Sequence, residues 1–394
     1  MGPDWLAMFS PYAQRAGGAE TRAFLRLVAQ PGIVSFAGGI PDASLFPREL
    51  IADSHRRVLE DPKSGSEALQ YSQSEGYAPL REWIAGHMRG KGVACGIENI
   101  LITNGSQQGL YLAGRLFLGE GDTVLTERPT YLGLLHAFAG NNPSYGPLSA
   151  LVGDAPVHAK LAYAMPDFAN PTGNSFTLAE RRALIENAQR HNVVLLEDAA
   201  YTDLRYSGEP RPSLLSLDIE RTGSIENSRV VYCGTFSKTI IPGLRTGWVI
   251  AARAVIEKMG LLKQASDFHT AALTQMVLTD VARRLPQSHL AHLCETYGER
   301  LRAMLEGLSA SMPKGVTWTK PEGGMFVWAT LPEKIDADEL LAEAISQGIA
   351  FVPGKSFFPG NPSRNTMRLS FTSCEPATIR YGLKRLGGLI AQRL

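Results

Sequence analysis

Residues 100–250 alternate between short apolar segments and longer amphipathic stretches, and this alternation limits the folds open to the chain. The amphipathic stretch 178–190, for example, has the length of a helix and is followed by an apolar segment. Strands that alternate with helices are joined by crossover connections, so neighbouring strands run parallel. We therefore predict an α/β fold with a mostly parallel, doubly wound sheet. The predicted strands are 100–103, 123–126, 161–164, 193–196 and 230–233.

The C-terminal part has a different pattern. It contains a predicted strand at 325–330, a helix near 338–347 and a further strand at 367–371. A chain of 394 residues exceeds the size at which one hydrophobic core normally stops growing. We therefore expect a large domain built on the parallel sheet and a smaller α+β domain.

Composition excludes several classes of protein. Hydrophobic residues make up 44% and charged residues 20% of the chain, as in ordinary soluble globular proteins. The net charge of +1 offers no electrostatic basis for binding nucleic acid or an anionic membrane. No apolar run is long enough to span a bilayer, and the N-terminus does not read as a signal peptide. We therefore expect a cytoplasmic protein without nucleic-acid or membrane partners.

The cysteines give no sign of a metal site or a disulfide framework. They are far apart in sequence, form no CxxC pair and have no histidine at metal-ligand spacing. They are typical of reduced thiols in a cytosolic protein, and we expect no bound metal. The four are Cys95, Cys233, Cys294 and Cys374.

A candidate anion site follows the first predicted strand. Residues 100–103 lead through Gly105 into a helix that begins near Ser106 and Gln107. Free backbone N–H groups and the positive end of the helix dipole favour a phosphate at such a position. The segment lacks both the P-loop spacing and the GxGxxG pattern, so it does not indicate a nucleoside triphosphate or a dinucleotide. An ordinary α/β turn is the alternative.

Polar and aromatic side chains follow the next predicted strands, where open α/β sheets hold ligands. Tyr131 could stack on a flat heterocycle or be a half-buried core aromatic. Asn170 lies in an Asn-Pro-Thr-Gly turn that directs its amide, although turn formation alone would explain it. Asp198 follows the end of a strongly apolar predicted strand, where a carboxylate is costly without a partner. It is therefore expected to face a cation or a polar ligand.

The stretch 234–248 places one lysine and one arginine among hydroxyl groups directly after an apolar strand. A buried Lys238 amine would lose proton affinity and could act as a Schiff-base nucleophile or a general base. Arg245, Thr235 and Ser237 are the kinds of group that bind a phosphate. By itself, a lysine in such a loop is more often a solvated surface residue.

Four further residues are candidates for binding. Arg368 lies between apolar residues of a strand, where an arginine is either paired structurally or available to a carboxylate ligand. Gly39 belongs to a glycine pair that permits close approach of a ligand, or forms a plain turn. Tyr71 is a phosphate-facing phenol or a loop aromatic. Arg22 lies in a short amphipathic segment, 21–29, that could form a helix.

Taken together, from Arg22 to Phe371, the order and spacing of these motifs resemble the fold type I pyridoxal-phosphate (PLP) enzymes, specifically the class I/II aminotransferases. Segments 35–41, 45–47 and 237–245 are most similar to the branch of 2-aminoadipate and kynurenine aminotransferases. The resemblance implies an N-terminal arm and part of the small domain at 1–45, a large PLP-binding domain at 46–285 and a C-terminal small domain at 286–394.

The resemblance also implies roles in the reaction. Lys238 would bind the cofactor covalently and, once freed by substrate, carry a proton between substrate and cofactor. Asp198 would keep the pyridine nitrogen protonated, and Tyr201 and Asn170 would bond the phenolic oxygen. Tyr131 would stack on the ring. The cofactor phosphate would be held by Ser106, Gln107, Thr235, Ser237 and Arg245, with Tyr71 reaching in from a second subunit.

For the substrate, the resemblance implies that Arg368 binds the α-carboxylate in a bidentate pair, with Asn170 beside it. Gly39 would let the N-terminal segment close over the substrate. Arg22 would meet a distal acid group, or be a helix-surface arginine. Residues 267–269 resemble a segment that crosses towards the partner's site.

The expected function is amino-group exchange between an L-amino acid and a 2-oxo acid such as 2-oxoglutarate, by ping-pong chemistry in a homodimer with shared active sites. The interval from Tyr131 to Asn170 is shorter than is usual in the family, and Ala169 stands where glutamine is common. A PLP-dependent lyase, cyclase or synthase of specialised amino-acid biosynthesis is therefore the alternative. A transcription regulator with an aminotransferase-like domain is disfavoured, because the chain shows no winged helix and no basic surplus.

Overall fold

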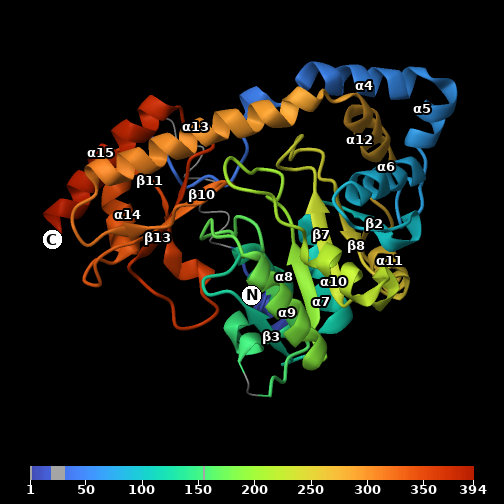
Figure 1. Ribbon diagram of the computed structural model, residues 1–394, viewed down its shortest axis with the longest axis horizontal. Coiled ribbons are helices and arrows are strands. Elements are labelled where there is room, and N and C mark those ends of the chain that lie inside the picture. The colour runs from blue at the N-terminus through green and yellow to red at the C-terminus, as the bar shows by residue number, and fades with distance from the viewer. Residues whose placement is uncertain (1, 19–31, 154–155) are drawn as a thin grey trace.

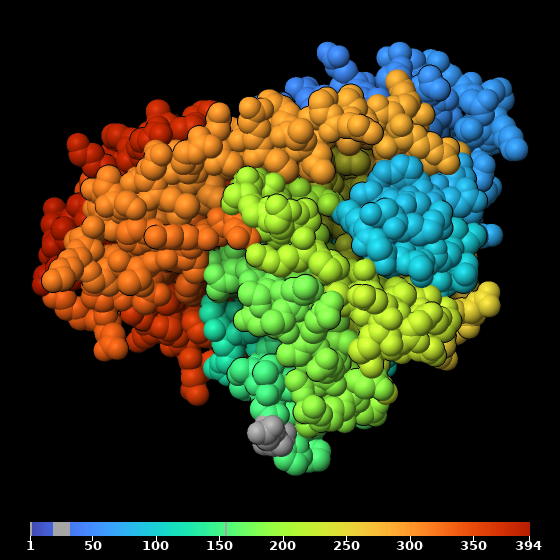
Figure 2. Space-filling view, in the orientation of Figure 1, coloured from blue at the N-terminus to red at the C-terminus, as the bar shows by residue number. Residues whose placement is uncertain are grey.

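The computed structural model describes residues 2–18, 32–153 and 156–394 (Figure 1). The amphipathic segment 21–29, and Arg22 with it, lies outside the described residues. One part of the molecule is built around a large twisted sheet, and the C-terminal residues form a second part beside it. The long helix α13 (Gln287–Ser311) runs along both parts, and the space-filling view shows them in direct contact (Figure 2).

The large sheet has seven strands among the described residues, in the order β2-β8-β7-β6-β5-β3-β4. Every neighbouring pair is parallel except those made by β8, which is antiparallel to β2 and β7. This confirms the prediction of a mostly parallel α/β sheet. The strands are β2 (Ile100–Thr103), β3 (Thr123–Thr126), β4 (Ser144–Pro147), β5 (Leu161–Ala164), β6 (Val194–Asp198), β7 (Val230–Thr235) and β8 (Gly247–Ile250).

Helices cover both faces of this sheet, because successive residues of each strand point to opposite faces. In β5, Leu161 and Tyr163 belong to one buried core, whereas Ala162 and Ala164 belong to another. Two cores separated by one sheet define the doubly wound arrangement. The helices of this part are α4 (Arg48–Glu60), α5 (Pro62–Ala68), α6 (Ala78–Arg89), α7 (Ser106–Phe117), α8 (Leu132–Phe138), α9 (Leu178–Arg190), α10 (Leu214–Thr222), α11 (Arg253–Asp267) and α12 (Ala272–Arg284).

The C-terminal part contains an antiparallel sheet with the order β12-β13-β10-β9. A separate short pair joins β1 to β11 in parallel, so residues near the N-terminus join this part of the chain. The domain boundaries at 45 and 285 stay a prediction. The elements are β1 (Val34–Ser35), β9 (Thr317–Trp318), β10 (Phe326–Thr330), β11 (Ile349–Ala350), β12 (Val352–Pro353), β13 (Thr366–Ser370), α14 (Ala337–Ser346) and α15 (Pro376–Gln392).

Two short helices, α1 (Trp5–Met8) and α2 (Pro11–Gln14), precede the segment outside the described residues. Arg15, just after α2, pairs with Glu120 at 2.7 Å, and the Tyr12 hydroxyl donates to Tyr111 at 3.4 Å. These contacts hold the N-terminal arm on the large part, beside α7.

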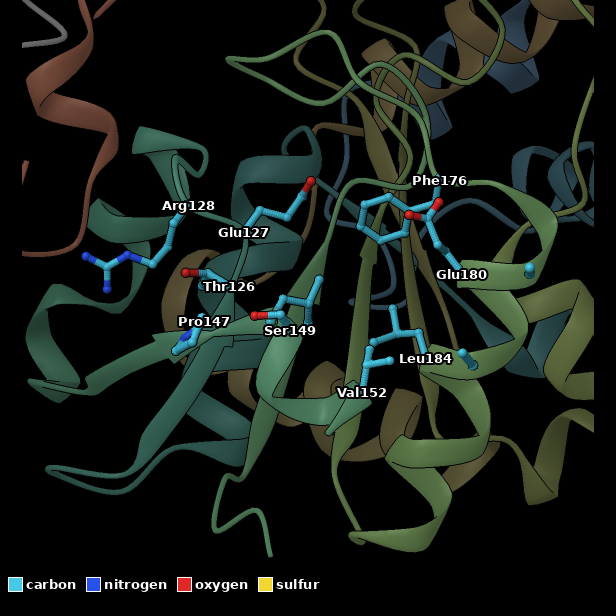
Figure 3. Close-up of a pocket in the computed structure, with 12 residues that line it drawn as sticks. Thr126, Glu127, Arg128, Pro147, Ser149, Val152, Phe176, Glu180 and Leu184 are labelled. Carbon is cyan, nitrogen blue, oxygen red and sulfur yellow. The ribbon is translucent and has the colours of Figure 1, made fainter. Parts of the chain in front are cut away.

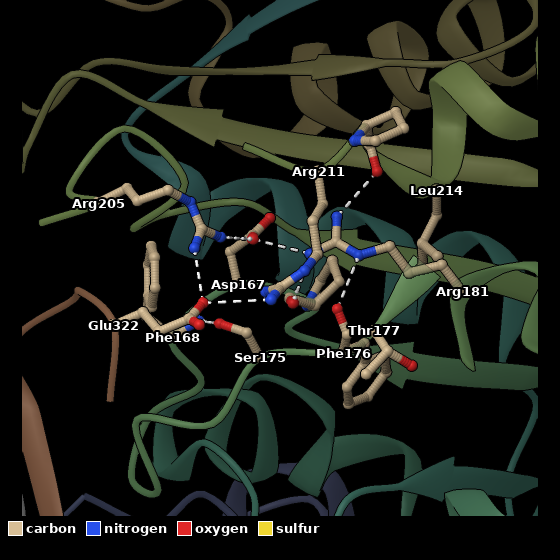
Figure 4. Close-up of polar contacts among 12 residues, drawn as sticks. Asp167, Phe168, Ser175, Phe176, Thr177, Arg181, Arg205, Arg211, Leu214 and Glu322 are labelled. Carbon is tan, nitrogen blue, oxygen red and sulfur yellow. Dashed lines mark hydrogen bonds and ion pairs between the residues drawn. The ribbon is translucent and has the colours of Figure 1, made fainter. Parts of the chain in front are cut away.

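A cluster of charged residues ties the two parts together (Figure 4). Asp167 pairs with Arg181 of α9 at 2.7 Å and with Arg205 at 3.1 Å. Arg205 also pairs with Glu322 of the C-terminal part at 2.8 Å, and Arg211 pairs with the same carboxylate at 3.2 Å. Because Asp167 and Arg181 are buried, loss of the Asp167 carboxylate would leave the Arg181 charge buried without its ion-pair partner. The cluster therefore fixes the turn that follows Asp167 relative to both parts.

The interval between Tyr131 and Asn170, which is short for the resembled family, still contributes α8, β4 and β5. In the connection from β4 to β5, the described residues form a short 3-10 helix, η4 (Leu148–Val152), and no other helix or strand. In the part of the chain that the structure describes, no helix is long and apolar enough to cross a membrane.

Candidate active site

A cavity of about 590 Å³ opens at the carboxyl ends of β5, β6 and β7. Parallel strands end at the same edge of a sheet, so residues distant in sequence meet there. The cavity walls also include Arg368 from β13 and backbone near Gly39, so both parts of the molecule contribute. The predicted site residues in its lining are Gly39, Ser106, Gln107, Tyr131, Asn170, Asp198, Tyr201, Thr235, Ser237, Lys238, Arg245 and Arg368.

Asp198 is the last residue of β6 and is buried. Its Oδ2 accepts a hydrogen bond from the Tyr163 hydroxyl at 2.8 Å, whereas its Oδ1 is buried with no partner among the described residues. Burial raises the pKa of Asp198 to about 6, against the opposing effects of the Tyr163 hydroxyl, the Ala200 N–H and the Lys238 charge. One oxygen of the carboxylate therefore lacks a hydrogen-bond partner among the described residues, and a donor or cation in the cavity would supply one.

Lys238 follows β7 and is half-buried. Its Nζ donates to the Gly39 carbonyl at 3.2 Å and lies 5.8 Å from the centre of the Tyr201 ring. Burial, followed by the positive charges of Arg245 and Arg368, lowers the pKa of Lys238 to about 8. The amine is therefore much closer to neutral at physiological pH than an ordinary lysine, as a nucleophile or base requires.

The other end of the cavity has the features of an anion site. Helix α7 begins at Ser106, and Gly105 before it adopts a φ of 76°, which glycine tolerates without strain. A Cβ atom at Gly105 would lie 2.5 Å from Nη2 of Arg245, so glycine also makes room for the guanidinium. Across the site, the Thr235 hydroxyl donates to the Ser237 hydroxyl at 2.9 Å. Helix N-terminus, hydroxyls and guanidinium thus converge.

The Gln107 side chain has partners within the protein. Its Nε2 donates to the Gly133 carbonyl at 2.7 Å, and its Oε1 accepts from the Tyr131 hydroxyl at 3.2 Å. These bonds orient the Tyr131 ring at the cavity wall. They leave the backbone N–H of Gln107, in the first turn of α7, as the group that can bind an anion.

Arg368 is buried between two aromatic rings, with its guanidinium carbon 4.2 Å from the centre of Phe326 and 5.2 Å from that of Phe357. Its Nη1 donates to Asn170 Oδ1 at 3.0 Å and its Nη2 to the Ala37 carbonyl at 3.1 Å. Its Nε is buried without a partner among the described residues. No carboxylate is paired with this cation there, so it is available to an anionic ligand.

One predicted residue among those that the structure describes is not brought to the cavity. Tyr71 is 80% exposed and does not line it; its ring instead meets Phe268 at 5.7 Å and His269 at 5.9 Å between centroids. Arg22 lies outside the described residues.

Sequence reasoning missed several residues of the site. Tyr163, predicted only as part of a strand, is the hydrogen-bond partner of Asp198; a lone tyrosine in an aliphatic strand was the available signal. Phe326 and Phe357 enclose the Arg368 guanidinium, and no sequence pattern marks Phe357. Met165 and His136 also line the cavity. Among the residues described, no group of three or more His, Cys, Asp or Glu side chains is arranged to hold a metal ion.

Comparison with known proteins identifies the family. The sequence model for "Aminotransferase class I and II" matches residues 45–142 and 165–386. The chain is 38% identical to the aromatic-amino-acid aminotransferase 1 of Thermococcus litoralis, over 99% of this chain and 96% of that protein. It is also 38% identical to the 2-aminoadipate transaminase of Thermus thermophilus, over 98% of both. The crystal structure of Pyrococcus horikoshii kynurenine aminotransferase, in complex with PMP, matches with a TM-score of 0.91 at 38% identity, covering 99% of this chain and 98% of that one.

The cavity has the groups that such an enzyme needs for its cofactor. They are the Asp198 carboxylate with one oxygen unpartnered among the described residues, the half-buried Lys238 amine and the anion site. The chain therefore belongs to the class I and II aminotransferases of fold type I and is a PLP-dependent transaminase.

Proposed function

We propose that this transaminase exchanges the amino group of an L-amino acid with a 2-oxo acid, with 2-oxoglutarate as an acceptor, in two ping-pong half-reactions. The observation that carries the proposal is the content of one cavity. It combines an amine with a lowered pKa, a buried carboxylate oxygen without a partner among the described residues, and a buried guanidinium with no carboxylate partner among them. Amino and oxo acids share the α-carboxylate that such a guanidinium binds, so one site can serve both half-reactions.

The residues of the cavity fit pyridoxal phosphate. Bound there, the cofactor supplies an electron sink for the substrate carbon that loses its proton. We propose that the free Oδ1 of Asp198 accepts from the pyridine N–H, while Tyr163 holds the other oxygen. Tyr131 would cover one face of the ring. The phosphate would lie on the N–H groups of Ser106 and Gln107 and on Thr235, Ser237 and Arg245.

The remaining residues would bind and move atoms of the substrate. Lys238 would hold the cofactor between turnovers. When released, it would take the proton from the substrate Cα and deliver it to the C4′ atom of the cofactor. Asn170 and Tyr201 would hold the phenolic oxygen, and both side chains line the cavity. Arg368, already oriented by Asn170 and the Ala37 carbonyl, would bind the α-carboxylate beside Gly39.

The rate at which the cofactor-free enzyme binds pyridoxal phosphate is expected to depend on pH. Only the neutral amine attacks the aldehyde, and the pKa of Lys238 is lowered from 10.5 to about 8. The rate of holoenzyme formation should therefore rise with pH and level off above about pH 8, as stopped-flow absorbance would record. A rate that keeps rising towards pH 10.5 would contradict the proposed environment of Lys238.

The direct test of transamination adds single amino acids to the holoenzyme without any oxo acid. A true donor should bleach the visible absorbance of the bound cofactor, and 2-oxoglutarate should restore it with formation of glutamate. Release of ammonia, with absorbance recovering unaided, would instead support a lyase, cyclase or synthase reaction. The panel would also identify the amino donor. The proposed site residues do not, because Arg368 would bind the α-carboxylate that all amino acids share.

We further propose that the enzyme is a homodimer in which Tyr71 contributes to the partner's phosphate site. In the single chain this tyrosine is 80% exposed beside Phe268, which is itself 48% exposed. Exposed aromatic rings in contact with each other are typical of a protein interface.

Hybrid dimers test this sharing. Lys238→Ala and Tyr71→Ala chains should each form weakly active homodimers. A hybrid of the two retains one site with both native residues, so its specific activity should be about half that of the wild-type dimer, whereas two independent sites would give no such restoration. Co-expression with two affinity tags isolates the hybrid. A hybrid no more active than the Tyr71→Ala homodimer would contradict the arrangement.

We also propose a cytoplasmic location. The four cysteines are free, and Cys95 and Cys233 are buried, which supports a reducing compartment. Fractionation of cells that express the protein would test this.

A further inference from the structure

A second cavity, of about 610 Å³, lies on the large part (Figure 3) and shares no lining residue with the cavity that contains Arg368. Its volume falls within the range of pockets that bind small molecules. It is formed by the chain at the end of β3, by η4 and by one side of α9. The residues that line it are Thr126, Glu127, Arg128, Pro147, Leu148, Ser149, Val152, Phe176, Ala179, Glu180, Ala183 and Leu184.

One wall of this cavity comes from a stretch that the family model does not match. The family model matches residues up to 142 and resumes at 165. Pro147, Leu148, Ser149 and Val152 all belong to the unmatched stretch and form one wall. One wall of the cavity is therefore formed by residues that the family model does not match, and the cavity shares no lining residue with the active-site cavity.

The walls are mostly apolar, but one half-buried polar group has few partners. Glu127 accepts a single hydrogen bond among the described residues, from the Met165 N–H to Oε2 at 3.1 Å, although a carboxylate can accept about four. Burial raises the pKa of Glu127 to about 7, as expected for a carboxyl group without a nearby cation. In Figure 3 its side chain extends towards Phe176 and Glu180.

The charges around the cavity favour a cation. Glu180 adds a second carboxylate, which also caps α9 by accepting from the Thr177 N–H at 2.7 Å. The one arginine in the lining, Arg128, points away from Glu127 and donates to the Gly360 carbonyl at 2.9 Å. The Thr126 hydroxyl is buried with no partner in the described part of the chain. Two carboxylates and one hydroxyl without a partner thus border an apolar cavity, and no cation of the described chain forms an ion pair with either carboxylate.

We propose that this cavity is a binding site for a small amphipathic amine. The apolar body of the ligand lies against Leu148, Phe176 and Leu184, and its protonated nitrogen donates to Glu127. Because Met165, whose N–H donates to Glu127, lines the active-site cavity, a ligand on Glu127 lies one hydrogen bond from the active-site wall.

The test uses N,N-dimethylbenzylamine, which is protonated at neutral pH and carries an apolar ring. Its tertiary nitrogen cannot condense with the cofactor aldehyde, so that route to the active site is closed. Titrated calorimetrically into the holoenzyme, it should bind one site per chain. For roughly ten non-hydrogen atoms, a dissociation constant on the order of 1 mM is expected. Absence of saturable binding would overturn the proposal.

Three variants locate the site. Glu127→Gln keeps an acceptor for the Met165 N–H but removes the charge, and should weaken binding by about tenfold or more. Ala183→Phe fills the cavity and should abolish binding. Glu186→Gln, on the same helix but outside the cavity lining, should bind as wild type does. Wild-type affinity in Glu127→Gln would overturn the proposal, even if Ala183→Phe failed to fold.

Discussion

Replacement of Lys238 by alanine is expected to lower kcat/KM for transamination by about 10⁴-fold or more. The residue is proposed both to hold the cofactor and to carry the substrate proton, and its lowered pKa suits both tasks. Lys238→Arg should not restore activity, because a guanidinium does not give up its proton at physiological pH. Steady-state assays with the donor found in the amino-acid panel would measure both variants.

A chemical readout separates this role from a general loss of folding. Borohydride reduction of the wild-type holoenzyme should attach the cofactor to the peptide that contains Lys238, as mass spectrometry would detect. Lys258→Ala, at an exposed lysine of α11, should keep wild-type activity and labelling. Attachment to another lysine, such as the buried Lys263, would show that the proposed role is wrong.

The second large effect is expected for Asp198→Asn, which should lower kcat/KM by about 10²–10³-fold. An amide cannot offer the full negative charge that a protonated pyridine nitrogen requires, and loss of one partner of a buried charged pair costs about 3–5 kcal/mol. The Tyr163 hydroxyl can still donate to the amide oxygen, so the local structure should be retained.

The same variant should stabilise the cofactor-free protein. The pKa of Asp198 is raised from 3.8 to about 6 in the folded chain, so the fold disfavours the charged form. This cost appears as pH rises from about 4 to 6 and is then present in full; it amounts to about 3 kcal/mol at most. Asp198→Asn should therefore raise the Tm at pH 8 but change it little at pH 4.

Asp218→Asn is a matched control for Asp198→Asn. Asp218 is also buried, but its oxygens already accept from Arg221 at 2.8 Å and from Ser228 at 2.7 Å. Its replacement should destabilise the protein and leave kcat/KM nearly unchanged. If Asp198→Asn were instead fully active, or less stable than wild type at pH 8, the proposed role of the Asp198 carboxylate would be wrong.

The large sheet was predictable because its signals are local. Each strand is a short apolar run, and the helix between β5 and β6, α9, begins at Leu178 and ends at Arg190, as the pattern at 178–190 predicted. The prediction for β6 ended at 196, whereas the strand continues to Asp198, which places the carboxylate in the sheet itself. The apolar pattern of a sequence marks strand ends only weakly, because polar residues are tolerated in a strand where it reaches a binding site.

Most of the candidate site was predictable for a related reason. Asp198, Lys238, Asn170 and Arg368 are polar residues in apolar or turn contexts, where each would be costly without a function. Tyr163 gave little warning, because its partner Asp198 lies 35 residues along the chain. The aromatic enclosure of Arg368 likewise depends on packing between distant strands and loops.

The sequence by itself determined the order of strands and helices, the chemical groups available at the strand ends and the family to which they point. Only the tertiary structure decided which oxygen of Asp198 lacks a partner, how far burial lowers the pKa of Lys238, and that a second cavity exists beside Glu127. The physical reason is that apolar periodicity is a property of neighbouring residues, whereas desolvation, unpaired atoms and cavities arise from contacts between residues far apart in the chain.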